Sequence, residues 1–389
     1  MKKIRVALIS DSVANISPHT KKGTEIFTYI YLTALRKFKK KECLPTLFGT
    51  GSSIVPAKIE SVIKDPTTEI KGVGEKFNFL FEMLLIAKAI NLQSKYDIFH
   101  INIGNGEYIV PFAEHINKPI IITMHGTTSD PYRKAFFSAA KTSMLENKNL
   151  HFVSISQSQR KCLPNLPYIK NIYHGIDVSR FFFHPKGGEM MVWTGRAVPE
   201  KGLDAVLDVA KNTNRKAKIF PIIKREYIEW LHDVIIKKRN IINQITRIQL
   251  DFDVKRSNLV REYQTAKLFL FPLGWEEPFG FTVIESMACG TPIVAYANGA
   301  LPEIVVDGKT GFLVNSSPKN IRGDWIIKKT GVEGLTEAVE RIYAMKAEEY
   351  LEMRKNCRMH VEKNFSSEHM ANQYMDLYRE VIAQKNTPQ

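Results

Sequence analysis

The sequence predicts an α/β protein made of two doubly wound domains with parallel sheets. Short apolar runs of the buried-strand type recur along the chain, as at 98–101 and 120–124. Segments with helical spacing separate these runs, and the alternation starts again in the second half with the apolar run 190–194. A chain of 389 residues is long enough for about two to three domains.

The composition and the N-terminus indicate a globular protein of the cytoplasm. The apolar run 6–9 near the N-terminus is too short for a signal peptide, and no run reaches the roughly 18 residues of a membrane-spanning helix. The four cysteines are scattered and form no CxxC pair, which argues against a zinc site and a disulfide framework. They are Cys43, Cys162, Cys289 and Cys357.

The formal net charge is +15, and roughly two thirds of the surplus lies in the first 170 residues. The densest basic run is 36–41. We favour a solvated helix end for this run, because cations are stabilised at the C-terminal end of the helix dipole. Peripheral contact with an anionic membrane at its inner face is the second interpretation. Nucleic acid is the weakest, because no known binding motif accompanies the charge.

Two polar features of the first half stand where strands are expected to end. Gly23 follows the first strand and opens a helix, so the backbone there could approach a phosphate, although no GxGxxG pattern is present. His125 follows the run 120–124, and His100 lies within another apolar run. Ligands of open α/β sheets gather at the carboxyl ends of strands, so we favour a functional role for His125. For His100 a structural role is favoured.

The second half carries two cations and two carboxylates in loops that follow strands. Arg196 and Lys201 flank a turn in GRAVPEKG (195–202), and both side chains can bind phosphate. Glu277 precedes the helix that begins near Gly280, and Glu285 lies inside that helix. A helix N-terminus suits a phosphate, and a carboxylate accepts hydrogen bonds from sugar hydroxyls. The pattern suits a ligand with phosphate in its middle and hydroxylated rings at both ends, which is the layout of a nucleotide sugar. Taken alone, however, two glutamates at a helix start are more often partners of the helix dipole, and two such cations are more often surface charges.

The stretch WEEPFGFTVIESMACGTPIVA (275–295) resembles the donor-binding signature of retaining glycosyltransferase family 4, which has the GT-B fold. GRAVPEKG resembles the diphosphate-binding loop of the same family. The segment around FVSISQSQR (152–160) is similar to a subgroup that includes bacterial UDP-glucose-dependent pterin glucosyltransferases. The resemblance implies two Rossmann-like domains that face each other across a cleft.

The resemblance also implies roles for single residues. Glu277 would hold hydroxyls of the donor sugar and Glu285 the ribose. Arg196 and Lys201 would neutralise the departing diphosphate, and His125 would position the donor sugar. Gly23 falls where the family has a glycine-rich loop that faces the diphosphate of the donor. The backbone amides of Phe279, Gly280 and Phe281 would also bind the donor.

We expect an acceptor-side domain at 1–175 plus 367–389 and a donor-binding domain at 176–366, with HGID (174–177) at the boundary. The implied reaction moves a hexosyl group from a nucleotide sugar to a hydroxyl acceptor with retention of configuration. UDP-glucose or another UDP-hexose is the favoured donor, and no metal or other cofactor is expected. The identity of the acceptor stays open: it is a growing surface glycan, a glycolipid or a small molecule. The alternatives are a catalytically silent binding subunit and a nucleotide-sugar epimerase.

Overall fold

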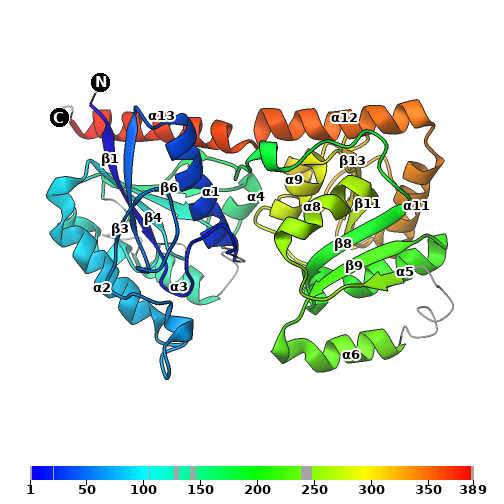
Figure 1. Ribbon diagram of the computed structural model, residues 1–389, viewed down its shortest axis with the longest axis horizontal. Helices are drawn as coiled ribbons and strands as arrows, with labels where there is room; N and C mark the ends of the chain where they lie inside the picture. Colours follow the sequence, from blue (N-terminus) through cyan, green and yellow to red (C-terminus); the bar gives the residue numbers. More distant parts are fainter. Residues whose placement is uncertain are drawn as a thin grey trace. The chain divides into compact units, whose positions relative to one another are not determined.

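The computed structural model divides the chain into two compact units, which are coloured along the sequence in Figure 1. The first unit comprises Met1–Asp177 and Ser366–Gln389, and the second comprises Val178–Phe365. The structure describes residues 2–20, 22–104, 106–126, 131–140, 145, 147–237 and 248–386.

The first unit is built on a seven-stranded sheet with the order β3-β2-β1-β4-β5-β6-β7, in which every neighbouring pair is parallel. The central strands β4 and β5 are buried along their whole length, as their apolar sequences require. The strands are β1 (Ile4–Ser10), β2 (Cys43–Phe48), β3 (Lys58–Glu60), β4 (Ile98–Asn102), β5 (Ile120–Met124), β6 (Leu150–Ser154) and β7 (Tyr168–Asn171).

The edge strand β3 lies within 52–74, a stretch rich in Gly, Pro, Ser and Thr whose lack of a clear period predicts a long surface segment rather than a strand. Lys58–Glu60 pairs with the end of β2, from Thr46↔Lys58 to Phe48↔Glu60. The strand is three residues long and exposed or half-buried throughout, so it has no apolar pattern that could reveal it. The segment also contains a short 3-10 helix, η1 (Thr67–Glu69).

Helices of the first unit pack on this sheet, and the last helix of the chain joins them. They are α1 (Gly23–Phe38), α2 (Asn78–Asn91), α3 (Pro131–Ala140), α4 (Gln157–Arg160) and α13 (Ser367–Asn386), with the 3-10 helices η2 (Gln93–Lys95) and η3 (Val110–His115). Figure 1 shows α13, in red, running beside α1, in blue. The basic run occupies the last turn of α1 and the residues after it, where Lys37 pairs with Asp177 at 3.6 Å.

His100 explains how α13 is fixed to the first sheet. Its Nδ1 lies 2.6 Å from the hydroxyl of Tyr378, and its Nε2 lies 2.7 Å from Oγ1 of Thr123. The Tyr378 hydroxyl in turn lies 2.8 Å from that of Tyr31 on α1. His100 is fully buried, and burial holds its pKa well below the usual range. A neutral, hydrogen-bonded histidine of this kind is a structural residue.

The second unit repeats the plan with a six-stranded parallel sheet in the order β10-β9-β8-β11-β12-β13. Its core unites apolar residues of the central strands with those of the amphipathic helices α5 and α11. The strands are β8 (Met190–Arg196), β9 (Ala217–Ile222), β10 (Ile248–Leu250), β11 (Ala266–Phe271), β12 (Ile293–Tyr296) and β13 (Gly311–Val314).

The helices of the second unit connect these strands and close the unit. They are α5 (Leu203–Thr213), α6 (Ile228–Lys237), α8 (Arg256–Thr265), α9 (Phe281–Ala288), α10 (Leu301–Ile304), α11 (Gly331–Ala344) and α12 (Ala347–Asn364), with the 3-10 helices η4 (Val178–Arg180), η5 (Pro199–Lys201) and η6 (Arg225–Tyr227). The fold class predicted from the sequence, two Rossmann-like α/β domains with parallel sheets, is confirmed.

Within the described part of the chain, every helix is too short or too polar to cross a membrane. The four cysteines are free thiols, and three of them are buried.

Candidate functional site

Two loops meet at the carboxyl-terminal edge of the second sheet. One follows β8 and contains η5, and the other joins β11 to α9; β8 and β11 are parallel neighbours, so both loops emerge on the same side. The amide of Gly274 donates to the carbonyl oxygen of Glu200 at 2.9 Å. Gly202 has a φ of +70°, and a Cβ there would lie 2.0 Å from the Pro272 carbonyl oxygen. Glycine at this position therefore lets the two loops pack directly on each other.

The position of Glu277 is fixed by a second glycine. The amide of Ala300 donates to the Glu277 carbonyl at 2.8 Å. Gly299 has a φ of +59°, and a Cβ there would lie 2.2 Å from that carbonyl oxygen and 2.3 Å from the Glu277 nitrogen. Only glycine allows the loop before α9 to lie this close to the segment after β12, so Gly299 sets where the Glu277 side chain points.

Lys201 and Glu277 form an ion pair across the two loops. Lys201 Nζ lies 2.7 Å from Glu277 Oε2, and Trp275 Nε1 donates to the same oxygen at 3.0 Å. Lys201 Nζ also lies 4.7 Å from the centre of the Trp275 ring, within the range of a cation–π contact. The two charged side chains are only 12% and 14% exposed. A phosphate or a sugar hydroxyl arriving here would meet a largely dehydrated cation and carboxylate, where electrostatic interactions are strong.

Glu285 is buried beneath the same edge, on α9. Its side chain is 1% exposed, and its Oε1 accepts a hydrogen bond of 2.8 Å from Nε of Arg256, the first residue of α8. Within the described residues no donor reaches the other oxygen, Oε2. A buried acceptor without a donor is costly, so Oε2 is an atom that a ligand hydroxyl would satisfy.

Arg196 is the last residue of β8, and its side chain is exposed. It lies on the same sheet edge as Lys201. Among the described residues no hydrogen bond or ion pair links Arg196 to Glu277 or Glu285. The structure therefore brings Lys201 and Glu277 together and leaves Arg196 as a solvated cation beside them.

At the start of α9 the groups suited to a ligand are backbone amides and not the phenylalanine side chains. Gly280 precedes the helix with a φ of +121°, a conformation that favours glycine. The Phe279 ring is 2% exposed and packs against Phe281 and Phe365, with ring centres 5.7 and 6.0 Å apart. Phe279 therefore belongs to the core through its side chain. The first turn of an α-helix lacks intrahelical acceptors for its amides and carries a partial positive charge, which favours an anion at this end of α9.

The remaining predicted residues, His125 and Gly23, belong to the first unit. Nε2 of His125 lies 2.8 Å from Oδ1 of Asn102, and no described residue forms a hydrogen bond with Nδ1. The ring packs against Phe27 and His174, with ring centres 4.7 and 5.4 Å away, and those two rings also contact each other. Burial lowers the pKa of His125 to about 3, so the imidazole is neutral at physiological pH.

Gly23 is the first residue of α1. A Cβ at Gly23 would meet nothing within 4 Å, and its φ lies outside the left-handed region. The local backbone therefore does not require glycine here, and a close approach of ligand to this turn stays a prediction.

Sequence reasoning missed Arg256, Trp275 and Gly299. Arg256 lies in DFDVKR (251–256), where the sequence singles out no side chain, because its partner Glu285 is 29 residues away along the chain. Trp275 opens the WEEPFG stretch but was not singled out as a neighbour of Glu277. Gly299 follows the signature, and nothing in a single sequence separates it from other turn glycines.

Residues 177–360 match the model of the family described as "Glycosyl transferases group 1". The match covers nearly all of the second unit, including both loops and α8 and α9. It shows that the second unit is similar to the group 1 glycosyltransferases.

Two relatives extend this likeness along the sequence. The chain is 24% identical over 276 residues to an uncharacterized glycosyltransferase of Methanocaldococcus jannaschii, which covers 67% of this chain and 73% of that protein. It is 47% identical over 70 residues to D-inositol 3-phosphate glycosyltransferase of Mycobacterium sp. strain KMS. That segment is 18% of this chain and 15% of the mycobacterial protein, so the chain spans only a small part of the latter.

Solved structures share the fold of the whole chain. Sucrose-phosphate synthase from Thermosynechococcus elongatus matches with a TM-score of 0.74 and 19% identity over 98% of this chain and 100% of that one. HepE of Anabaena in complex with UDP-glucose matches with a TM-score of 0.68 and 15% identity over 97% and 100%. At these identities the likeness establishes the fold alone, that of two Rossmann-like domains in one chain.

Proposed function

We propose that the protein is a retaining glycosyltransferase that moves a hexosyl group from a nucleotide sugar, UDP-glucose or another UDP-hexose, to a hydroxyl acceptor. The acceptor is either part of a growing glycan or glycolipid or a small molecule. The observation that carries the proposal is the Lys201–Glu277 pair on two interlocked loops at the carboxyl-terminal edge of the second sheet. The match of the second unit to the group 1 glycosyltransferases supports it.

Lys201 and Glu277 suit the two sides of the bond that is broken, which joins the sugar of the donor to its diphosphate. When a donor binds, Lys201 exchanges Glu277 for a phosphate oxygen, and Glu277 accepts hydrogen bonds from hydroxyls of the sugar. Lys201 keeps an anionic partner in this exchange, and Trp275 Nε1 can continue to donate to Glu277. Arg196 and the start of α9 add positive charge for the second phosphate.

The nucleoside end is assigned to Glu285. Its Oε1 is held by Arg256 while Oε2 is buried without a donor, so a ribose hydroxyl would complete the carboxylate. UDP is the favoured nucleotide because solved neighbours were obtained with it. HepE was captured with UDP-glucose, and the Escherichia coli trehalose-6-phosphate protein was bound with UDP-2-fluoro glucose.

The chemistry needs no residue as a nucleophile. The acceptor oxygen attacks the anomeric carbon on the face from which the diphosphate leaves. The bond between the anomeric carbon and the diphosphate oxygen breaks, and the proton of the acceptor hydroxyl passes to the departing phosphate. Arg196 and Lys201 stabilise the charge that develops on that phosphate. With Nε2–H of His125 donating to Asn102, Nδ1 is the atom of this side chain that could accept a hydrogen bond from a ligand hydroxyl.

A thermal-shift panel of UDP-, GDP- and ADP-sugars tests the donor. A ligand that binds only the folded state raises the free energy of unfolding, by about 2.7 kcal/mol when the ligand concentration is one hundred times its dissociation constant. The midpoint temperature of unfolding rises as a result. We expect UDP-glucose to raise the midpoint of the wild type and of Lys218→Ala but not of Lys201→Ala. Lys218 is a matched control, because it pairs with Glu262 at 2.8 Å in the same unit. A panel with no shift for any sugar would contradict the proposal.

The silent subunit and the epimerase are less favoured, because the donor-binding pattern is intact and matches a transferase family. Incubation with UDP-glucose alone separates the three. A transferase releases UDP slowly by hydrolysis, a silent subunit releases none and leaves the sugar unchanged, and an epimerase yields an epimerised sugar product.

A further inference from the structure

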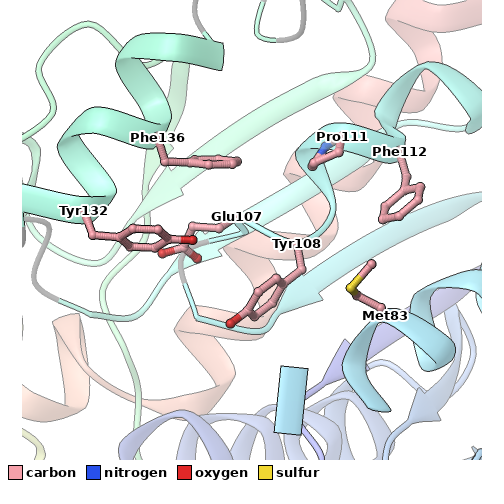
Figure 2. A pocket seen from close by; sticks show the side chains of 7 residues that line it. All are labelled: Met83, Glu107, Tyr108, Pro111, Phe112, Tyr132 and Phe136. Carbon is pink, nitrogen blue, oxygen red and sulfur yellow. The ribbon is translucent and has the colours of Figure 1, made fainter. Parts of the chain in front are cut away.

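An aromatic hollow of about 180 Å³ lies within the first unit, apart from the residues assigned to the donor. Four rings line it, together with Met83 of α2 and Pro111 of η3. Figure 2 shows these rings converging from two elements, with Tyr132 and Phe136 on α3 facing the segment that carries Tyr108 and Phe112.

The hollow follows the carboxyl ends of two central strands. Residues 107–112 come after β4, which ends at Asn102, and α3 comes after β5, which ends at Met124. His125 and Asn102, which form the hydrogen bond described above, stand at the same two strand ends. Ligands of doubly wound sheets bind outside this edge, so the hollow lies where the first unit would receive a substrate.

The walls of the hollow are held by the core. Phe136 packs edge-on against Phe137 with ring centres 5.2 Å apart, and Phe137 is buried against Phe152. Gly106 has a φ of +86°, and a Cβ there would lie 2.5 Å from Cγ2 of Ile122 on β5. Glycine thus allows the segment that begins at Glu107 to lie directly on the sheet.

One carboxylate, that of Glu107, lies at the hollow. Glu107 lines it and is 5% exposed, with its carboxylate paired to Arg133 of α3. Burial raises the pKa of the Tyr108 hydroxyl, and the nearby carboxylates of Glu82 and Glu107 add to this. Glu107 is thus a charged group at one side of a hollow whose lining is otherwise mostly aromatic.

Size and lining together select the kind of group. An apolar cavity of about 150 Å³ takes one benzene ring, so this hollow matches a single ring and is too small for a long lipid chain. A sugar ring would bring several hydroxyls into a site lined almost wholly by apolar side chains, and each unsatisfied hydroxyl would cost about 1–3 kcal/mol. A flat ring instead gains from stacking and edge contacts with the four aromatic walls.

We propose that this hollow binds the acceptor, and that the acceptor carries an aromatic or heteroaromatic ring next to the hydroxyl that is glycosylated. The part of this proposal that names the ring-bearing molecule as the acceptor rests on the proposed glycosyltransferase activity. The preference of the hollow for an aryl ring does not.

Saturation-transfer NMR with three simple alcohols tests the preference. The probes are 2-phenylethanol, 1-hexanol and methyl β-D-glucopyranoside, each added to the full-length protein. We expect the aryl protons of 2-phenylethanol to receive the strongest saturation. Phe136→Ala, which removes one wall, should weaken this binding about fivefold or more, the equivalent of one lost aromatic contact. Phe252→Ala is the matched control, because Phe252 is a 44% exposed phenylalanine of the second unit.

A filling variant guards against loss of structure in Phe136→Ala. Met83 lines the hollow and is 39% exposed, so Met83→Trp adds bulk from the open side without disturbing the core. It should abolish aryl saturation while the midpoint of unfolding stays that of the wild type. Equal saturation of the three alcohols, or unchanged aryl saturation in Met83→Trp, would overturn the proposal.

The same variants separate this inference from the proposed function. Phe136→Ala and Met83→Trp should keep the thermal shift with UDP-glucose. If UDP-glucose gives no shift in the wild type while the aryl preference holds, the glycosyltransferase proposal fails and the aryl site stands. If UDP-glucose shifts all proteins and the aryl preference is absent, only the present inference is overturned.

Discussion

Glu25 is a buried carboxylate that the structure places beside a second one. It lies in the first turn of α1 with 1% of its surface exposed. Burial, with the negative charge of Asp11, raises the pKa of Glu25 to about 8, and burial raises that of Asp11 to about 6. The folded state therefore binds a proton on Glu25 more tightly than the unfolded state does.

The raised pKa of Glu25 predicts a loss of stability with rising pH. The favourable contribution is fully present below the unfolded pKa near 4.5 and is lost as the pH rises through about 8. Glu25→Gln cannot ionise, so its midpoint of unfolding should fall less than that of the wild type between pH 5 and pH 9. Glu42→Gln, at an ion-paired surface position, is the control. Parallel curves for Glu25→Gln and the wild type would contradict the prediction.

The Arg256–Glu285 pair is the second test at this scale. Arg256→Ala leaves the Glu285 carboxylate buried without a cation, which costs about 3–5 kcal/mol for a fully buried pair. Because the Arg256 side chain is 35% exposed, we expect the lower end of that range. Arg215→Ala breaks the pair with Glu340, in which both partners are about 40% exposed, and should cost about 0–1 kcal/mol. Urea unfolding of both variants measures the difference, and equal losses would show that Glu285 does not depend on Arg256.

Single residues also mark how far the sequence could be interpreted. Lys201 and Glu277 were assigned from neighbouring loops of the expected sheet, and the structure brings them into one ion pair. Arg256 and Gly299 could not be found, because each acts through a neighbour that only the folded chain supplies. Local spacing carries no information about such contacts.

At the scale of elements, the loop before α9 depends on a close backbone approach at Gly299. Gly299→Ala should displace Glu277, since its Cβ would lie 2.2 Å from the Glu277 carbonyl oxygen. We expect the thermal shift with UDP-glucose to be lost.

Gly331→Ala is the control for Gly299→Ala. It has a similar φ of +61°, but its Cβ would have only the Ser316 carbonyl oxygen, at 3.6 Å, within 4 Å. It therefore carries the strain of a left-handed backbone, about 1–3 kcal/mol, without the collision. An undiminished shift in Gly299→Ala, measured by the same titration, would refute the role of the close approach.

The predicted strands and helices were most reliable where the pattern was long or wholly apolar. The sequence predicts three helices near its end, at 332–345, 347–363 and 366–382, and they correspond to α11, α12 and α13. The buried runs gave β4 and β5. The edge strand β3 escaped because pairing with β2, rather than an apolar pattern, makes it a strand. Edge strands that bury little surface leave little trace in composition.

At the scale of the whole molecule, the two units differ in how much can be said of them. The second unit matches a family along nearly its whole length, so its function can be proposed residue by residue. The first unit lies outside that match and holds the aromatic hollow. The ligand of the hollow is inferred from its volume and its lining side chains, not from similarity to a family. The acceptor, which the sequence left open, is therefore best approached through the first unit.

Metal independence remains a prediction for the protein as a whole. In the proposed chemistry Arg196, Lys201 and the start of α9 supply the positive charge that a metal would otherwise provide. UDP release from UDP-glucose should therefore proceed at the same rate with and without EDTA. A fall of tenfold or more that Mg²⁺ or Mn²⁺ restores would show that a metal takes part in the reaction.

The central claim is that Lys201 and Glu277 hold a nucleotide sugar between two interlocked loops. The most direct measurement is the rate of UDP release from UDP-glucose by the wild type, Lys201→Ala and Lys218→Ala. The account predicts that Lys201→Ala falls about 100-fold or more, as for removal of a group that stabilises a developing oxyanion, while Lys218→Ala keeps the wild-type rate. Equal rates for Lys201→Ala and the wild type would contradict it.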